Sequence, residues 1–264
     1  MRIAVCFYGL VGSVSNKNGE GVELNPDIAH SYFLANVLNH NENIDVFIHS
    51  TSTGKKEDLI RLYNPKAFKF EVQREFPEIF SHKWLYGTLL NRFKLSLLRF
   101  FRRSKYIKLK TSMENDAFRA YSRWFSVRES ISLMRQYEEK NEFKYDYVLS
   151  TRLDLAFFTP LVFNHYDPKF FYASHWNDAP QNGSSNANAE NHNVGSGFLD
   201  LWFFSNSDTM YHFSKLFDKI DKYPVSPHIS SYQHAVSINS DIRYTLFRWT
   251  DHELVRRRLF NSEK

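Results

Sequence analysis

Short apolar runs and apolar positions at helical spacing alternate along the first 75 residues. Residues 2–8 and 44–49 are apolar runs that predict buried strands, and residues 67–72 alternate as a third strand. Between the first two strands, Asn25-Pro26-Asp27 predicts a helix start with a capping side chain, a first-turn proline and a dipole-matched acid. A strand, a helix and a strand in this order predict a parallel sheet with right-handed crossovers.

The same periodicities continue through the rest of the chain. We expect the first helix to bury one face at helical spacing, formed by Ile28, Tyr32, Ala35 and Leu38. Further helices are predicted over residues 57–63, 84–103, 115–140, 207–220 and 230–238. Further strands are predicted over residues 145–149, 170–174, 197–205 and 242–247. The pattern therefore predicts an α/β fold with a mostly parallel central sheet flanked by helices.

Positive charge is concentrated between residues 79 and 113. This segment holds nine basic residues and no acidic ones, so the rest of the chain carries a net charge of −4 against +5 for the whole protein. On a helix over residues 84–103, an arc of about 120° would hold Leu89, Leu90, Phe93, Leu97, Phe100 and Phe101. The arc predicts either a core-packing helix with a solvated cationic face or an interfacial helix drawn to anionic lipid. Nucleic acid is the least favoured partner, because no recognised nucleic-acid-binding module is present.

Composition narrows the compartment and the chemistry. Cys6 is the only cysteine, which excludes an intramolecular disulfide and a cysteine-based metal cluster and suits a reducing compartment. The first apolar run is too short for a signal peptide, and no stretch approaches the roughly 20 apolar residues of a membrane span. We therefore expect a cytoplasmic protein, either soluble or peripheral at the inner face of the membrane. The 25 Phe and 15 Tyr suit a packed core and also sites that stack bases or sugar rings.

Arg152 and Asp154 follow directly after the predicted strand 145–149. Ligands of open α/β sheets bind beyond the carboxyl ends of the strands, so this pair is the first candidate for a site. Two residues apart on an extended chain, both side chains point to the same face. Arg152 suits a phosphate, and Asp154 suits a divalent metal or a sugar hydroxyl. The alternative is a structural ion pair that caps the strand.

A glycine-containing turn, residues 8–13, follows the first strand. Neither G-x-G-x-x-G nor G-x-x-x-x-G-K-[ST] is present, so the turn fits a nucleotide site and a plain chain reversal alike. His49 ends the second predicted strand at the same edge of the sheet. A lone histidine there is more often a hydrogen-bonded structural group than a catalyst.

A second pair of candidate acids lies in the carboxyl-terminal half. Residues 176–196 are dominated by Asn, Ser, Gly and Ala and predict a lid, which contains Asp178. The strand predicted next is apolar except for Asp200, and an acid inside such a run must be paired or functional. Asp200 is therefore the first candidate and Asp178 the second for a base or an acceptor contact.

Three segments, in this order, carry a resemblance to a known family: Phe47-Ile-His-Ser-Thr51, Ser122-Arg-Trp-Phe-Ser126 and Tyr145-Asp-Tyr-Val-Leu-Ser-Thr-Arg-Leu-Asp154. The chain resembles bacterial GT-A glycosyltransferases, and more narrowly those of lipopolysaccharide and capsule synthesis. The resemblance covers most of the chain and implies a GT-A-like, Rossmann-like sheet. It implies a nucleotide-binding half (1–75 and 115–160), a basic amphipathic insertion (79–113) and an acceptor-side half (161–264) with the lid 176–196.

The resemblance also implies how the donor is bound. In that family an Asp-x-Asp motif holds a divalent metal that bridges the donor diphosphate. Position 152 is Arg here, so Asp154 alone matches and would hold Mn²⁺ or Mg²⁺, while Arg152 can itself neutralise the diphosphate. Arg123 would assist, and the nucleotide would be bordered by Tyr8, Gly9, Ser13 and His49.

These features predict transfer of a sugar from a nucleotide-sugar donor to a glycan or lipid-linked acceptor in surface polysaccharide synthesis. Asp200, or Asp178, would contact the acceptor or act as the base, and the lid would exclude water. Two other classes stay open from the sequence: a non-catalytic nucleotide- or carbohydrate-binding module, and another nucleotide-dependent transferase.

Overall fold

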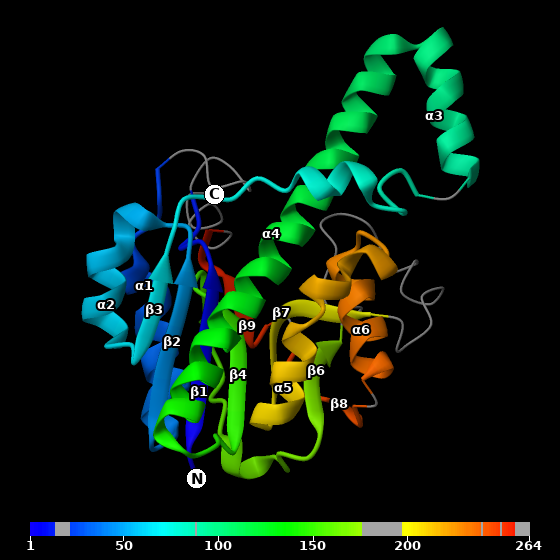
Figure 1. Cartoon of the computed structure of the whole chain (residues 1–264). Coiled ribbons are helices and arrows are strands. Elements are labelled where there is room, and N and C mark those ends of the chain that lie inside the picture. The colour runs from blue at the N-terminus through cyan, green and yellow to red at the C-terminus, as the bar shows by residue number, and fades with distance from the viewer. Residues whose placement is uncertain (14–21, 88, 176–196, 239, 249, 257–264) are drawn as a thin grey trace.

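A seven-stranded sheet forms the centre of the molecule (Figure 1), which is a computed structural model. The structure describes residues 1–13, 22–87, 89–175, 197–238, 240–248 and 250–256. The strand order is β3-β2-β1-β4-β7-β6-β8, and the first four strands run parallel. β7 is antiparallel to both of its neighbours, and β8 is parallel to β6. The expected mostly parallel α/β sheet is confirmed.

The strands match the apolar runs closely. Those of the central sheet are β1 (Ile3–Gly9), β2 (Ile44–Ser50), β3 (Ala67–Phe70), β4 (Tyr147–Arg152), β6 (Phe171–His175), β7 (Phe198–Ser205) and β8 (Ile242–Tyr244). A separate two-stranded sheet pairs β5 (Leu155–Phe157) with β9 (His252–Leu254). β1 and most of β4 are buried throughout, as expected of parallel strands covered on both faces.

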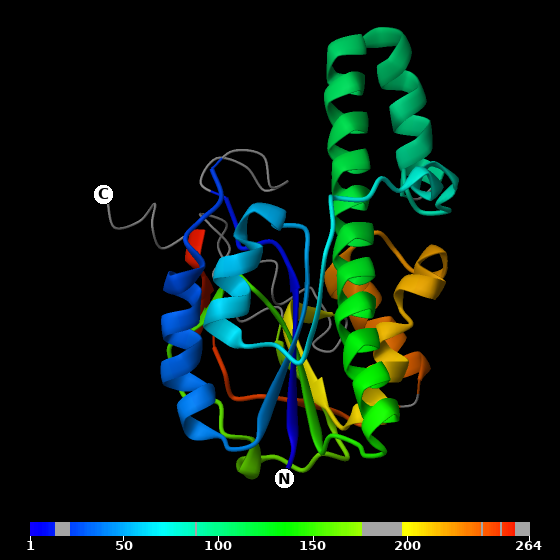
Figure 2. The same cartoon turned by 60° about the vertical axis from the view of Figure 1, so that its left-hand side comes forward.

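Helices cover both faces of the sheet (Figures 1 and 2). They are α1 (Pro26–Asn36), α2 (Lys56–Tyr63), α3 (Leu89–Phe101), α4 (Arg103–Asn141), α5 (Ser207–Ser214) and α6 (Pro227–Ser237). In the described part of the chain, 3-10 helices span Leu38–His40, Thr53–Lys55, Pro77–Ser81, Phe163–His165 and Phe217–Lys222. One core cluster lies between the sheet and α4, and a second lies on the face covered by α1 and α2.

The buried face of α1 differs from the expected one. The helix buries Pro26, Ala29 and Phe33, whereas Ala35 is exposed and Ile28, Tyr32 and Leu38 are only half-buried. The Asn25 side chain accepts a hydrogen bond from the Asp27 amide and sets where the helix begins. The helix then packs on β1 through Phe33, whose ring lies 4.8 Å from that of Phe7. The expectation was wrong because several apolar arcs fit one short helix.

Helix α4 begins at Arg103, twelve residues before the predicted helix 115–140. Residues 88–141 contain neither Gly nor Pro, so the only interruption is the reversal between α3 and α4. α3 and the first turns of α4 form a helical hairpin that projects from the body of the molecule (Figures 1 and 2). We call this hairpin, residues 89–113, the arm. The basic segment is therefore a projecting structure rather than a helix lying against the sheet.

Two predictions for the carboxyl-terminal part were wrong in detail. The helix expected over 207–220 ends at Ser214 and is followed by the 3-10 helix Phe217–Lys222. Its cap is Asn206, whose side chain accepts from the Thr209 amide at 2.9 Å. The strand expected over 242–247 ends at Tyr244. The paired strands β5 and β9 were not predicted, because three residues each are too few for a periodic pattern.

We expect His252→Phe to make folding less sensitive to acid. His252 is buried on β9, and neither ring nitrogen has a hydrogen-bond partner among the described residues. Burial lowers its pKa from 6.5 to about 4, so between these pH values the unfolded chain binds a proton that the folded chain does not. Stability therefore falls as pH drops through this window, by up to about 1.4 kcal/mol per pH unit at this position.

Urea unfolding of wild type and His252→Phe at pH 7 and pH 5 measures this slope. The exposed His40, on the 3-10 helix Leu38–His40, provides the control variant His40→Phe, which should keep the wild-type slope. Equal slopes for wild type and His252→Phe would contradict the prediction.

Candidate active site

The sheet has its topological switch point between β1 and β4. From β1 the chain builds β2 and β3 on one side, and β4 then pairs with the other side of β1. Ligands of open α/β sheets bind in the crevice that such a reversal opens at the carboxyl ends of the strands. In the register of these two strands Tyr8 lies beside Arg152, so both end at this crevice. Two of the residues singled out from the sequence, Tyr8 and Arg152, thus lie at the place where the fold favours a ligand.

Arg152 and Asp154 form a bidentate ion pair at this edge. Arg152 Nε donates to Asp154 Oδ1 at 2.6 Å, and Arg152 Nη2 donates to Oδ2 at 2.7 Å. The Asp154 side chain is fully buried, and that of Arg152 is 15% exposed. Burial raises the pKa of Asp154, but the guanidinium groups of Arg152 and Arg256 outweigh it and hold that pKa below its usual range. Asp154 therefore stays ionised and holds the exposed side of Arg152 in place.

The turn after β1 packs directly against this pair. Gly9 and Gly12 have φ values of +90° and +91°, which favour glycine. A Cβ at Gly12 would lie 3.0 Å from Leu24 Cδ1 and 3.3 Å from Asp154 Cβ, so a larger residue would displace the pair. Ser13, at the end of the turn, is buried and forms a β-bridge with Glu23. The turn closes over Asp154, which explains why that carboxylate has no solvent contact.

A second arginine–aspartate pair lies on the same side of the sheet. Arg123, on α4, forms an ion pair with Asp200, on β7, and also donates to the Asp200 carbonyl at 3.5 Å. The Tyr8 hydroxyl donates to the carbonyls of Asp200 and Leu201, each at 3.2 Å, and so connects β1 to β7. The isolated acid in the apolar strand is therefore paired, and its partner is the arginine expected to contact the donor.

His228, near the start of α6, completes the surroundings of Asp200. Its Nδ1 donates to the Phe198 carbonyl at 2.7 Å and lies 3.4 Å from Asp200 Oδ1. The pKa of His228 is lowered to about 4, chiefly by burial. The hydrogen bond to the Phe198 carbonyl opposes this decrease, and the nearby Arg123 contributes to it. The ring is neutral near pH 7, and the donation from Nδ1 assigns the lone pair to Nε2.

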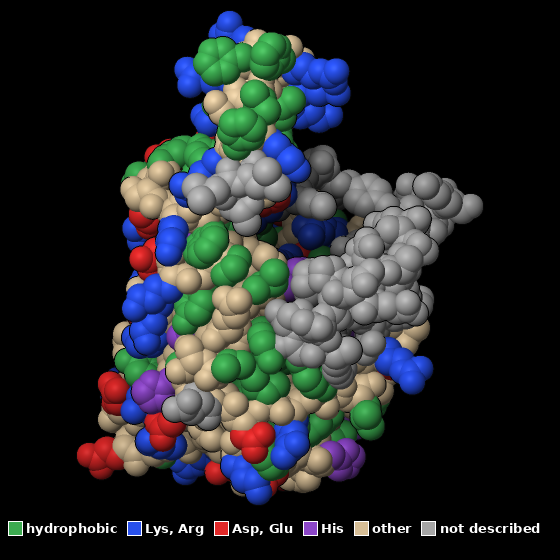
Figure 3. All heavy atoms as spheres, turned by 90° about the vertical axis from the view of Figure 1, so that its right-hand side faces the viewer, with side chains coloured by type: hydrophobic (Ala, Val, Ile, Leu, Met, Phe, Trp, Pro, Cys, Tyr) green, Lys and Arg blue, Asp and Glu red, His purple; other side chains and the backbone are tan. Residues whose placement is uncertain are grey.

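Three guanidinium groups, those of Arg123, Arg152 and Arg256, lie near one another at this edge. The pKa of Arg123 is lowered to about 10, chiefly by burial. The adjacent Arg152 and Arg256 contribute to this decrease, and Tyr8 and Asp154 oppose it. Asp154 and Asp200 pair with two of these groups, those of Arg152 and Arg123. Figure 3 shows cationic side chains and a histidine inside a hollow of the surface below the arm. An anion that accepts several hydrogen bonds, such as a diphosphate, suits this arrangement.

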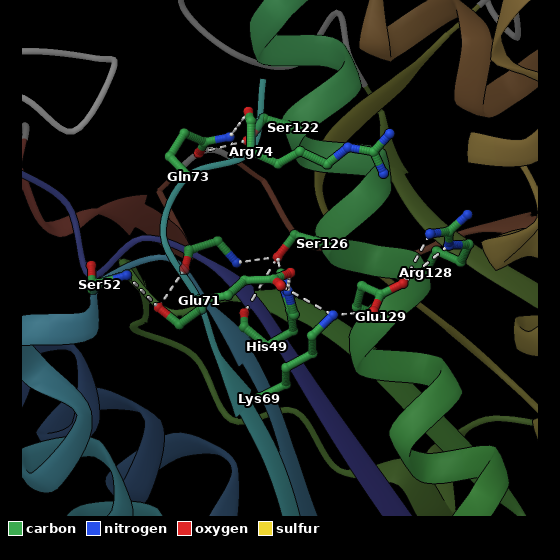
Figure 4. Close-up of polar contacts among 12 residues, drawn as sticks. His49, Ser52, Lys69, Glu71, Gln73, Arg74, Ser122, Ser126, Arg128 and Glu129 are labelled. Atoms are coloured by element: carbon green, nitrogen blue, oxygen red, sulfur yellow. Dashed lines mark hydrogen bonds and ion pairs between the residues drawn. The ribbon is translucent and has the colours of Figure 1, made fainter. Parts of the chain in front are cut away.

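His49 lies behind the turn and not among these charges. The residue is fully buried, with Nδ1 2.6 Å from Ser126 Oγ and Nε2 2.8 Å from Glu71 Oε1 (Figure 4). Ser126 Oγ also accepts from the Gly9 amide at 2.9 Å. Both ring nitrogens are thus engaged, and burial lowers the pKa of His49 although Glu71 raises it. The arrangement suits a group that positions the turn through Ser126.

Neither candidate donor set fits a divalent cation. Both oxygens of Asp154 already accept from Arg152, and a cation there would face the like charges of Arg152 and Arg256. A second cluster brings oxygens of Glu71 and Glu129 together with His49. The ammonium group of Lys69 already bridges those two carboxylates, at 3.2 and 2.8 Å (Figure 4). In both places a protein cation holds the position that a metal would need.

Two residues of this site were missed from the sequence. Arg256 follows β9, whose neighbour Val255 donates its amide to the Asp154 carbonyl at 2.9 Å. The run of three arginines at 256–258 was a usable signal, since it directly follows an apolar pair. His228 carries no local signal, because its role depends on α6 packing against β7. Asp178 and the expected lid 176–196 lie outside the described residues.

Comparison with known proteins leaves the family open. No protein-family model matches the chain, and no curated protein matches its sequence. A nucleoside-diphosphate-sugar pyrophosphorylase from Vibrio cholerae RC9 aligns over 96% of this chain and 95% of its own, with 10% identity and a TM-score of 0.42. Mouse xyloside xylosyltransferase 1, in its apo form, aligns over 92% of this chain and 84% of its own, with 11% identity and a TM-score of 0.38. Similarity of this degree does not assign a family.

Proposed function

We propose that the protein is a glycosyltransferase that moves a sugar from a nucleotide-sugar donor to a glycan or lipid-linked acceptor. One observation carries the proposal: two half-buried arginines, each paired with a buried acid, lie beside the switch point between β1 and β4. A nucleotide diphosphate is a dianion whose release must be stabilised during transfer, and guanidinium groups provide that stabilisation. Synthesis of a surface polysaccharide is the setting that the sequence resemblance favours.

The donor diphosphate binds to arginines in this proposal. Arg152 makes the principal contact, held in orientation by Asp154, and Arg123 and Arg256 add charge from α4 and from the end of β9. Tyr8, Gly9 and Ser13 border the nucleotide, and His49 positions their turn. The leaving diphosphate gains charge as the glycosidic bond breaks, so preformed cations lower the barrier.

The acceptor side is assigned to Asp200. Its carboxylate is paired with Arg123 in the protein described here. When the donor diphosphate engages Arg123, the pair loosens and Asp200 becomes free to take the proton of the acceptor hydroxyl. The neutral His228 beside it adds no second positive charge next to the carboxylate. Asp178 remains the second candidate for this role.

We expect nucleotide sugars to stabilise the protein in the absence of divalent metal. A thermal-shift panel of UDP-, GDP- and CMP-sugars at 1 mM, in EDTA and in Mn²⁺, measures this. With arginines as the phosphate ligands, the preferred donor should raise Tm equally in both media, because neither donor set leaves a position for a metal. Slow hydrolysis of that donor should follow.

The matched reference in this panel is each free sugar and each free nucleoside. A shift that appears only with Mn²⁺ would contradict arginine binding and restore a metal at this edge. A shift with free sugar and none with any nucleotide would replace the transferase by a carbohydrate-binding module.

A further inference from the structure

The arm carries an exposed apolar face. On α3 the side chains of Phe93, Leu97, Phe100 and Phe101 are 62%, 44%, 79% and 81% exposed. These four residues belong to the apolar arc of the predicted helix 84–103, for which the sequence left open packing in the core or contact with a membrane. Because they are exposed, they do not pack in the core. Leu95, on another face, is the buried one among the α3 side chains described, those of residues 91–101. Figure 3 shows hydrophobic side chains at the end of the arm with cationic ones around them.

A pocket of about 510 Å³ follows the neighbouring face of α3. Arg92, Leu95, Ser96 and Arg99 line it, and their spacing of three and four residues puts them on one side of the helix. The opposite wall is formed by Tyr106 and Lys110 of α4 together with Phe80, Ser81, His82, Lys83 and Tyr86. The pocket therefore lies between the two helices of the arm and its base.

The lining of the pocket is cationic. Lys83, Arg92, Arg99 and Lys110 contribute four positive charges, and none of the lining residues is acidic. The nearest acid in the hydrogen-bond network is Glu114, which accepts from Lys110 Nζ at 3.2 Å and from the Tyr86 hydroxyl at 2.9 Å. Arg92 donates to the Lys83 carbonyl, which orients its guanidinium at the base. A ligand with two or more negative charges would balance these cations.

We propose that this pocket binds the phosphate headgroup of an anionic membrane lipid, with the apolar face of the arm in the adjoining acyl boundary. An apolar helix face beside a cationic one is the arrangement of interfacial helices, and each basic residue adds attraction to an anionic leaflet. Two arginines on one helix face can hold a phosphate through paired hydrogen bonds. Among the described residues no helix is long and apolar enough to cross a membrane, so the arm would lie at the surface. The site extends the proposed function by bringing the protein to a lipid-linked acceptor.

Co-flotation with phosphatidylcholine vesicles tests the site, using the full chain. The vesicles contain phosphatidic acid or phosphatidylserine at matched surface charge, so a difference between them reports on recognition of the uncapped, terminal phosphate that phosphatidic acid carries. We expect wild type to bind phosphatidic acid vesicles more tightly, by about tenfold. Arg92→Gln/Arg99→Gln should lose this preference, whereas Arg102→Gln/Arg103→Gln removes the same charge from the exposed tip and should keep it. Phe100→Ser/Phe101→Ser should lose binding to both kinds of vesicle, and the exposed body variant Leu246→Ser should not.

Three results would overturn the site. Equal binding to both lipids by wild type would leave no headgroup recognition. If both double arginine variants lose the preference for phosphatidic acid equally, the arm attracts lipid through its overall charge and the pocket is not a specific site. Stabilisation by inorganic pyrophosphate that Arg92→Gln/Arg99→Gln abolishes, without vesicle binding, would assign the pocket to a soluble anion. Because flotation requires no sugar transfer, these results are independent of the donor panel, and failure of one leaves the other standing.

Discussion

Arg152→Gln should lower donor affinity about 100-fold and destabilise the fold by about 3 kcal/mol. In the proposed donor complex the Arg152 guanidinium makes two charge-assisted hydrogen bonds to phosphate, and the substitution removes both. The stability loss arises because Asp154 is fully buried and loses the partner that accounts for most of its favourable surroundings. Arg256 remains nearby, which places the cost at the lower end of the range for a broken buried pair. Isothermal titration with the preferred donor and urea unfolding measure the two effects.

The double variant Arg152→Gln/Asp154→Asn separates these effects. Replacing both charges by neutral amides removes the unpaired buried carboxylate and should recover much of the lost stability. Donor affinity should stay low, because the phosphate ligand is still missing. The destabilisation of Arg152→Gln should also shrink as the pH falls, because protonation of Asp154 removes the buried charge. Recovery of donor affinity together with stability would make Arg152 a structural partner of Asp154 and nothing more.

Much of the sheet was predictable because parallel strands are buried on both faces. β1, β2 and β4 each contain a short apolar run, and their boundaries were predicted within about three residues. The position of β7 between β4 and β6 was not predictable, since strand order depends on contacts far apart in sequence. The basic amphipathic insertion 79–113 was predicted with a helix over 84–103, but its folding into a hairpin that projects from the body was not.

The site shows the same division between local and tertiary information. Arg152 and Asp154 were predictable because they follow a buried strand and lie two residues apart. The isolated charge of Asp200 indicated that it must have a partner or a function. The local sequence did not identify Arg123 as that partner, because Arg123 lies 77 residues earlier, on α4. His49 was placed at the correct edge of the sheet. Its connection to Ser126 and Glu71, which directs both nitrogens away from the charged crevice, depends on how α4 packs.

Asp200→Asn should slow hydrolysis of the preferred donor by about 10²- to 10⁴-fold while leaving donor affinity within about threefold. Loss of a general base removes acceleration of that size. Donor affinity is spared because the variant leaves Arg123 in place and removes the carboxylate that competes with the diphosphate for it. The result is therefore a fall in kcat with little change in KM, which is the signature of an interaction made only during the reaction.

Asp218→Asn is the matched control for this prediction. Asp218 also pairs with an arginine of α4, with 2.8 Å between its Oδ1 and Arg128 Nη1, but its side chain is 42% exposed. Breaking that pair should change neither kcat nor KM, because exposed ion pairs contribute little. If Asp200→Asn weakens donor binding and turnover to the same degree, the carboxylate acts by orienting Arg123 rather than as a base. Wild-type turnover in Asp200→Asn would move the base to another residue, and Asp178→Asn would then be the variant to measure, because the reaction still requires a group that accepts the proton of the attacking hydroxyl.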